Sequence, residues 1–151
     1  MLKILKSTLA IAIIITAFTA CEKKDPTGIK KVNWDRDTCD RCVMVLSYRN
    51  HAVQISNPST GKAYNFDDIG CALTWFEEEK ITWKKDAKIW IADIKTGDWL
   101  DARTAYYNTG NLTPMGYGYG AHELVASIEK NEESIDFKEV EKRVISKLEK
   151  K

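Results

Sequence analysis

The sequence predicts an α+β domain built mostly from antiparallel strands. Short β-branched or alternating runs indicate strands, and longer stretches with apolar residues at helical spacing indicate helices. These segments follow one another in the order strands, helix, strands, helix, helix. Such grouping argues against a doubly wound parallel sheet, in which strands and helices alternate.

The expected strands fall into two groups. Residues 43–48 are β-branched and apolar, and residues 51–56 alternate between apolar and polar side chains. A turn at 57–61 leads into a third short strand at 62–66. The later strands are expected at 87–94, 99–100 and 105–107, with a hairpin turn at 95–98.

Three helices complete the expected order. Asp67 and Asp68 place carboxylates where a helix N-terminus favours negative charge, and apolar residues follow at helical spacing. Residues 121–130 are expected to form a second helix. Asp136 with Glu139 matches a capping box, which predicts the start of a last helix.

Residues 1–20 have the layout of a signal peptide. Lys3 and Lys6 precede an apolar run at 9–18, and small residues then lead to Cys21. The apolar run is short for a membrane span, which needs roughly 20 apolar residues. The segment therefore predicts export rather than a transmembrane anchor.

The residues before Cys21 resemble a bacterial lipobox. This resemblance implies a diacylglyceryl thioether on Cys21, so that the chain is lipid-anchored in the cell membrane or outer membrane and faces the periplasm. Residues 21–32 are polar and turn-rich and are expected to form a tether. Residues 33–151 then form the folded domain, which is long enough to bury a core.

Charge and residue pattern argue against two broad classes of function. Lys and Arg number 23 against 22 Asp and Glu, and the two signs are interspersed, so no basic surface for nucleic acid is expected. No nucleophile–base arrangement is apparent, and Asp67 and Asp68 are interpreted as a helix start rather than a catalytic pair. We therefore do not expect an enzyme.

A sulfur-rich motif, Cys39-x-x-Cys42-x-Met44, carries the chemistry of the domain. With Cys21 lipidated, three thiols remain. In an oxidising compartment, three cysteines cannot all pair as disulfides, so at least one stays a free thiol or all three stay reduced for another purpose. Soft sulfur ligands select copper(I), zinc or iron–sulfur clusters, and a thioether narrows the choice because zinc sites draw on Cys, His and carboxylates. In a strand, Cys42 and Met44 would point to the same face.

A second methionine strengthens the metal hypothesis. Met115 lies between Pro114 and Gly116 in a glycine-rich loop, where core packing explains it poorly. His122 follows, inside the expected helix at 121–130, and offers an imidazole ligand. The candidate metal ligands are therefore Cys42, Met44, Met115, Cys39 and His122.

Three other interpretations of the cysteines stay open. Cys39 and Cys42 can form a simple disulfide, or act as a thiol–disulfide oxidoreductase, although a redox Cys-x-x-Cys normally opens a helix. Zinc can use both together with Cys71 and a histidine. Cys71, on a helix beside apolar residues, is interpreted as a small buried side chain rather than a ligand.

Three segments together resemble one known family. They are the Cys39-x-x-Cys42-x-Met44 motif, the Phe66-Asp67-Asp68-Ile69-Gly70-Cys71 segment and the Thr113-Pro114-Met115-Gly116-Tyr117-Gly118 loop, in this order after the lipobox. Together they resemble the NosL family, the lipoprotein copper chaperones of nitrous oxide reductase maturation in denitrification. The likeness covers nearly the whole domain.

The resemblance implies both a fold and a function. The implied fold is a pair of ββαβ-like units. The implied function is a periplasmic copper(I) chaperone that works with a membrane transporter complex and supplies copper to nitrous oxide reductase. The metal ligands it implies are Cys42, Met44 and Met115, followed by Cys39, and Val43 stands where the family usually has glycine.

Overall fold

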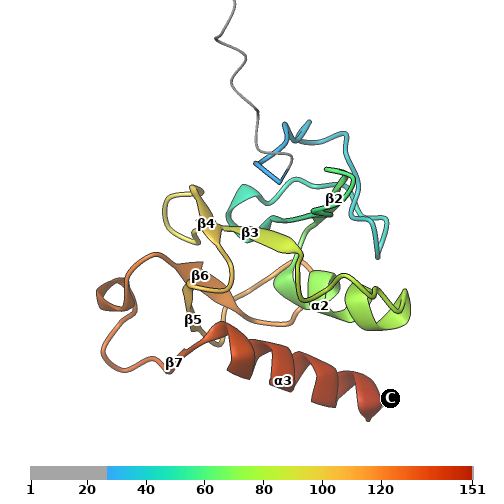
Figure 1. The fold of residues 1–151 in the computed structure, drawn as a ribbon. Helices are drawn as coiled ribbons and strands as arrows, with labels where there is room; N and C mark the ends of the chain where they lie inside the picture. The colour runs from blue at the N-terminus through green and yellow to red at the C-terminus, as the bar shows by residue number, and fades with distance from the viewer. Residues whose placement is uncertain (1–26, 151) are drawn as a thin grey trace, which may run out of the picture.

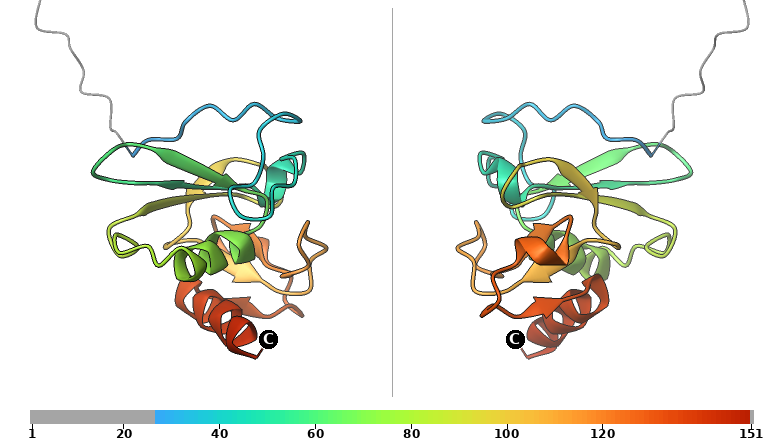
Figure 2. Two further views of the ribbon diagram at one scale, coloured as in Figure 1. Left: turned by 90° about the vertical axis from the view of Figure 1, so that its right-hand side faces the viewer. Right: turned by 90° about the vertical axis from the view of Figure 1, so that its left-hand side faces the viewer.

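The computed structural model describes residues 27–150, so the signal peptide and Cys21 lie outside the described residues. Residues 27–150 form two antiparallel sheets and two α-helices, which confirms the predicted α+β class (Figure 1). Figure 2 shows the larger sheet above one helix, with the last helix below it. Within this part of the chain, no helix is long and apolar enough to cross a membrane.

The first half of the domain builds a four-stranded sheet and the helix that covers it. The strand order is β2-β1-β3-β4, and each neighbouring pair is antiparallel. The run β1, β2, α2, β3 is a ββαβ unit, in which α2 packs against β1 and β2. The elements are η1 (Arg49–His51), β1 (Val53–Ser56), β2 (Ala63–Phe66), α2 (Ile69–Glu78), β3 (Lys88–Ala92) and β4 (Trp99–Asp101).

The second half builds a smaller sheet with strand order β6-β5-β7, also antiparallel. Here the connection between the second and third strands contains a single 3-10 turn, and the α-helix follows the third strand. The elements are β5 (Tyr106–Asn108), β6 (Gly120–His122), η2 (Val125–Ser127), β7 (Ser134–Ile135) and α3 (Phe137–Glu149).

The core lies between the sheets and the two helices. Every residue of α2 from 69 to 76 is buried, and α3 buries Phe137, Val140 and Val144 along one face. An aromatic group surrounds Trp75, whose ring centroid lies 4.7 Å from that of Tyr64. This packing fixes the position of α2, and therefore of the side chains at its N-terminus.

Helix caps and strand starts follow the sequence closely. Asp68 caps α2 and accepts a hydrogen bond from Gly70 N. Asp136 caps α3 and accepts one from Glu139 N. The strands expected in 51–56, 62–66, 87–94, 99–100 and 105–107 all form, within one or two residues of the expected ends.

Two predicted elements were wrong. Residues 43–48 form a turn and loop rather than a strand, because Val43 has a φ of 64° and Val45 makes only an isolated bridge to Thr38. Residues 121–130 do not form an α-helix and contain only the short 3-10 helix η2. Ala121 pairs with Tyr107 in the second sheet, and tertiary hydrogen bonding outweighs the local helix preference.

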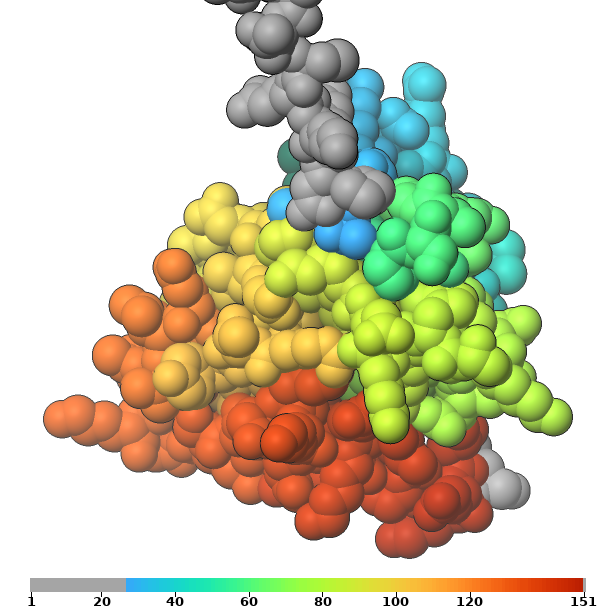
Figure 3. Space-filling model, viewed as in Figure 1, coloured from blue at the N-terminus to red at the C-terminus, as the bar shows by residue number. Residues whose placement is uncertain are grey.

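The first described residues run against the four-stranded sheet. Trp90 Nε1 donates a hydrogen bond to the Thr27 carbonyl at 2.9 Å. Lys30 N donates to Gln54 Oε1 at 2.7 Å, and the amide of Gln54 returns a bond to the Lys30 carbonyl at 3.2 Å. Figure 3 shows the first described segment, from residue 27 onward and in blue, at the upper end of the molecule.

Candidate metal centre

Three thiols and one carboxylate meet at the N-terminus of α2. Cys39 and Cys42 come from the preceding loop, Asp67 lies just before the helix, and Cys71 is in its first turn. The three Sγ atoms and an Asp67 carboxylate oxygen all lie within 4.8 Å of one another. Cys39 and Cys71 are buried, Cys42 is partly exposed, and all three are free thiols. We call these four residues the thiol cluster.

A tight turn brings the first two cysteines together. Cys39 N donates to the Met44 carbonyl at 2.8 Å, and Val43 N donates to the Cys39 carbonyl at 3.0 Å. Val43 closes this turn in the left-handed region, which is rare for a β-branched residue. Asp40 N also donates to the Asn65 carbonyl at 2.8 Å, which fastens the loop to the edge strand β2.

Hydrogen bonds distribute protons unevenly among the thiols. The hydrogen bond from the Cys71 thiol, helped by Cys42 N at 3.4 Å, lowers the pKa of Cys39 to about 4. Burial raises the pKa of Cys42 to about 12, and its thiol donates to Asp67 Oδ2 at 3.4 Å. The pKa of Cys71 is also raised, mainly because its thiol donates a hydrogen bond to Cys39. The cluster therefore holds one thiolate and two protonated thiols near neutral pH.

Arg41 places a cation beside these sulfurs. Its Nε and Nη2 donate to the two carboxylate oxygens of Glu78 at 2.7 and 2.8 Å. Its Nη1 lies 3.9 Å from Cys71 Sγ. The Glu78 carboxylate raises the pKa of Arg41, so the guanidinium stays charged. This fork joins the cysteine loop to the far end of α2.

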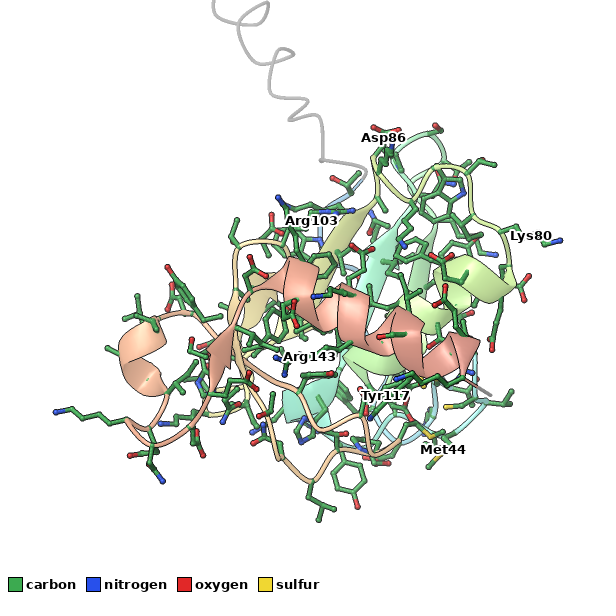
Figure 4. All side chains as sticks on the ribbon, turned by 90° about the horizontal axis from the view of Figure 1, so that it is seen from below. Met44, Lys80, Asp86, Arg103, Tyr117 and Arg143 are labelled. Atoms are coloured by element: carbon green, nitrogen blue, oxygen red, sulfur yellow. The ribbon has the colours of Figure 1, made fainter. Side chains whose placement is uncertain are left out.

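The two predicted methionine ligands are exposed side chains. Met44 is 45% exposed and Met115 is 37% exposed. Met115 and Arg41 line the same cavity of about 430 Å³, which lies between α2, the Met115 loop and the end of α3. Figure 4 shows Met44 and Tyr117 near the same edge of the molecule in that view.

His122 lies in a different environment. It is a residue of β6, and its Nε2 is 3.1 Å from Asn108 Oδ1 in the second sheet. The side chain is 2% exposed, and burial lowers its pKa. His122 is not one of the four residues whose ligand atoms converge.

Two members of the thiol cluster were not expected as ligands. The sequence predicts a small core side chain for Cys71 and a helix start for Asp67. Both interpretations describe the local setting, since both side chains are buried at the beginning of α2. Helical spacing does not mark Asp67 as a ligand, because it precedes the N-cap Asp68 and lies outside α2. Its proximity to the three thiols follows from the fold rather than from a local sequence pattern.

This donor set suits a soft metal ion. Thiolates are ligands for both copper(I) and zinc, and a carboxylate is also a zinc ligand. The centre is largely buried, so a bound ion would be shielded from water on the side of Cys39 and Cys71. The partly exposed Cys42 and the two methionines lie toward solvent.

Comparison with known proteins identifies the fold. No protein-family model and no curated protein matches the sequence. Among solved structures, the chain is similar to the crystal structure of the copper chaperone NosL from Shewanella denitrificans, with a TM-score of 0.63 and 14% sequence identity. The match covers 76% of this chain and 96% of that one. It confirms the NosL-like fold that the ordered motifs predict.

Proposed function

We propose that this protein is a membrane-anchored copper(I) chaperone that delivers copper to nitrous oxide reductase. The observation that carries the proposal is the convergence of three thiols and Asp67 within 4.8 Å in this fold. Cys42, Met44 and Met115 hold the ion on its exposed side, and Cys39 and Cys71 on its buried side. Copper(I) in this proposal is cargo rather than a resident cofactor.

The arrangement of donors favours copper(I) over zinc. Thioether sulfur is a ligand for copper(I), whereas zinc draws on thiolate, imidazole and carboxylate. The Cys39, Cys42, Cys71 and Asp67 donors alone would also satisfy zinc. Met44 and Met115 are both exposed, and a thioether donor from either one would favour copper(I).

The gradient of burial supports a role in transfer. Cys39 and Cys71 are at most 1% exposed, while Met44 is 45% exposed. An acceptor can replace the outer ligands one at a time while the inner thiolates still hold the ion. Stable storage would instead favour a fully enclosed site.

The anchor and the client rest on the sequence. Cys21 in its lipobox is the proposed lipidation site, with residues 21–32 as the tether to a domain at 33–151. The order of the three NosL-like motifs supports nitrous oxide reductase as the recipient and a membrane transporter complex as a second partner. Periplasmic localisation follows from the same signal peptide.

A thiol–disulfide oxidoreductase is the alternative, and the thiols are poorly arranged for it. A nucleophilic cysteine needs both a low pKa and access to its substrate. Here the thiol with the pKa of about 4, Cys39, is 1% exposed, while the accessible Cys42 has a pKa of about 12. We therefore expect no insulin-reducing activity.

A competition titration tests copper binding. The purified mature chain, kept reduced, should take one equivalent of copper(I) from a chromophoric chelator. The Cys42→Ser and Met115→Leu variants should compete less well, and a control variant at an exposed turn, Ser59→Ala, should match the wild type. Failure of the wild type to remove copper from the chelator, or tighter binding of zinc than copper(I), would overturn the proposal.

A transfer assay tests the client. Copper-loaded chain mixed with copper-free nitrous oxide reductase should lose its copper to the enzyme and restore the absorption of the enzyme's copper centres. The same copper presented as a small-molecule complex at equal free concentration is the control. Equal rates from both sources would contradict a specific delivery function.

A further inference from the structure

Two adjacent carboxylates at the start of α2 face two different loops. Asp67 accepts a hydrogen bond from the Cys42 thiol, in the thiol cluster. Asp68 faces the loop that carries Met115, and it is only 1% exposed. The N-terminus of one helix therefore contacts both segments that supply the proposed ligands.

Asp68 uses both of its carboxylate oxygens. Oδ1 accepts from Gly70 N at 2.9 Å and caps α2. Oδ2 accepts from the Thr113 hydroxyl at 2.6 Å and lies 3.4 Å from Met115 N. Thr113 Oγ1 in turn accepts from Gly118 N at 3.1 Å, so one hydroxyl joins both ends of the loop to the helix cap.

Tyr117 makes a second attachment between this loop and α2. Its ring lies over Gly70 so closely that a Cβ there would be 2.0 Å from Tyr117 Cγ. Its hydroxyl is 3.1 Å from Thr74 Oγ1, one helical turn further along. The Met115 loop is thus held at both sides of Met115, which leaves little freedom for a swinging ligand.

We propose that Asp68, through Thr113, is a positioning residue that fixes Met115 as a preformed copper(I) ligand beside the thiol cluster. The inference rests on the proposed function and adds to it a division of labour between the neighbouring carboxylates. Asp67 serves the thiols, and Asp68 serves the thioether. Pre-organisation of this kind raises affinity because the loop need not be ordered when the metal binds.

Thr113→Val tests the proposal with the least disturbance, because it removes the hydroxyl while Asp68 still caps α2. Copper(I) affinity should fall about tenfold, as is typical when a partner of a metal ligand is lost. Met115→Leu should weaken binding by at least as much. In the double variant, the loss should equal that of Met115→Leu alone, because Thr113 acts only through Met115.

The matched control is Thr109→Val, since the Thr109 hydroxyl contacts Glu133 rather than Asp68. X-ray absorption of the copper-loaded protein gives a second readout. The wild type should show a longer thioether Cu–S distance in addition to the thiolates, and Thr113→Val should lose it while its thiolate distances stay the same. A purely structural role would leave this signature in place.

The outcomes separate the inference from the proposed function. A wild type that binds no copper(I) overturns both. A wild type that binds, together with a Thr113→Val variant of unchanged affinity, overturns the positioning role alone. So does a Thr113→Val effect of the same size in the Met115→Leu background, because the hydroxyl would then act through the fold in general.

Discussion

Replacement of Gly70 by alanine sets local helix preference against tertiary packing. Gly70 lies in the first turn of α2, and its φ is not in the left-handed region. By helix propensity alone, Gly70→Ala should stabilise the protein by up to about 1 kcal/mol. The structure predicts the opposite sign, because the Tyr117 ring occupies the space that the new methyl group needs.

The size of the effect follows from the contact geometry. The Cβ would lie 2.0 Å from Tyr117 Cγ, whereas carbon atoms rest at about 3.5–4.0 Å. The ring must therefore move by at least about 1.5 Å. Overpacking of this kind costs about 1–3 kcal/mol, and loss of the Tyr117–Thr74 hydrogen bond costs about 1 kcal/mol more. After the propensity gain, the net destabilisation is about 1–3 kcal/mol.

Urea denaturation of the reduced protein, followed by tryptophan fluorescence, measures this change. The control is the same substitution in a Tyr117→Ala background, where the methyl group has room. There Gly70→Ala should be neutral or slightly stabilising. A Gly70→Ala protein as stable as wild type, or an equal cost in both backgrounds, would refute the reasoning from the Tyr117 contact.

Three further predictions concern the charges around the centre and the last helix. Arg41→Lys keeps the charge but loses the two-pronged bond to Glu78, and copper(I) affinity should fall about tenfold, while Arg36→Lys at an exposed site should change nothing. Cys39 has a folded pKa of about 4 against 9.0 for an ordinary thiol, so its contribution to stability is present above pH 9 and is lost as the pH falls toward 4. The unfolding free energy should therefore decline with falling pH, and Cys39→Ser should flatten that slope. Asp136→Ala removes the cap of α3 and should cost about 1 kcal/mol in thermal or urea unfolding.

The elements that the sequence predicts well are those with a local cause. β1 alternates, Asp68 begins α2 and Asp136 begins α3, and each appears where it was expected. The prediction of a strand at 43–48 failed because a β-branched composition does not reveal the positive φ of Val43. The prediction of a helix at 121–130 failed because its first two residues, Ala121 and His122, belong to β6, which pairs with the distant strand β5.

The site shows the same limit. Cys39 and Cys42 were identified from their spacing, and the structure brings them together. Their neighbours Asp67 and Cys71 come from a segment 25 or more residues away, and only the fold places them at the same point. Whether Met44, Met115 and His122 bind the ion stays a prediction.

The origin of the thiols in two separate segments links cargo to folding. Unfolding would separate Cys71 on α2 from the Cys39–Cys42 turn, so a metal ion that bridges them would bind the folded chain more tightly than the unfolded one. Each tenfold excess of free metal over the dissociation constant then adds about 1.4 kcal/mol to stability. Under the proposed function, the empty chain should therefore be the more protease-sensitive form, and copper supply would affect how long each copy survives.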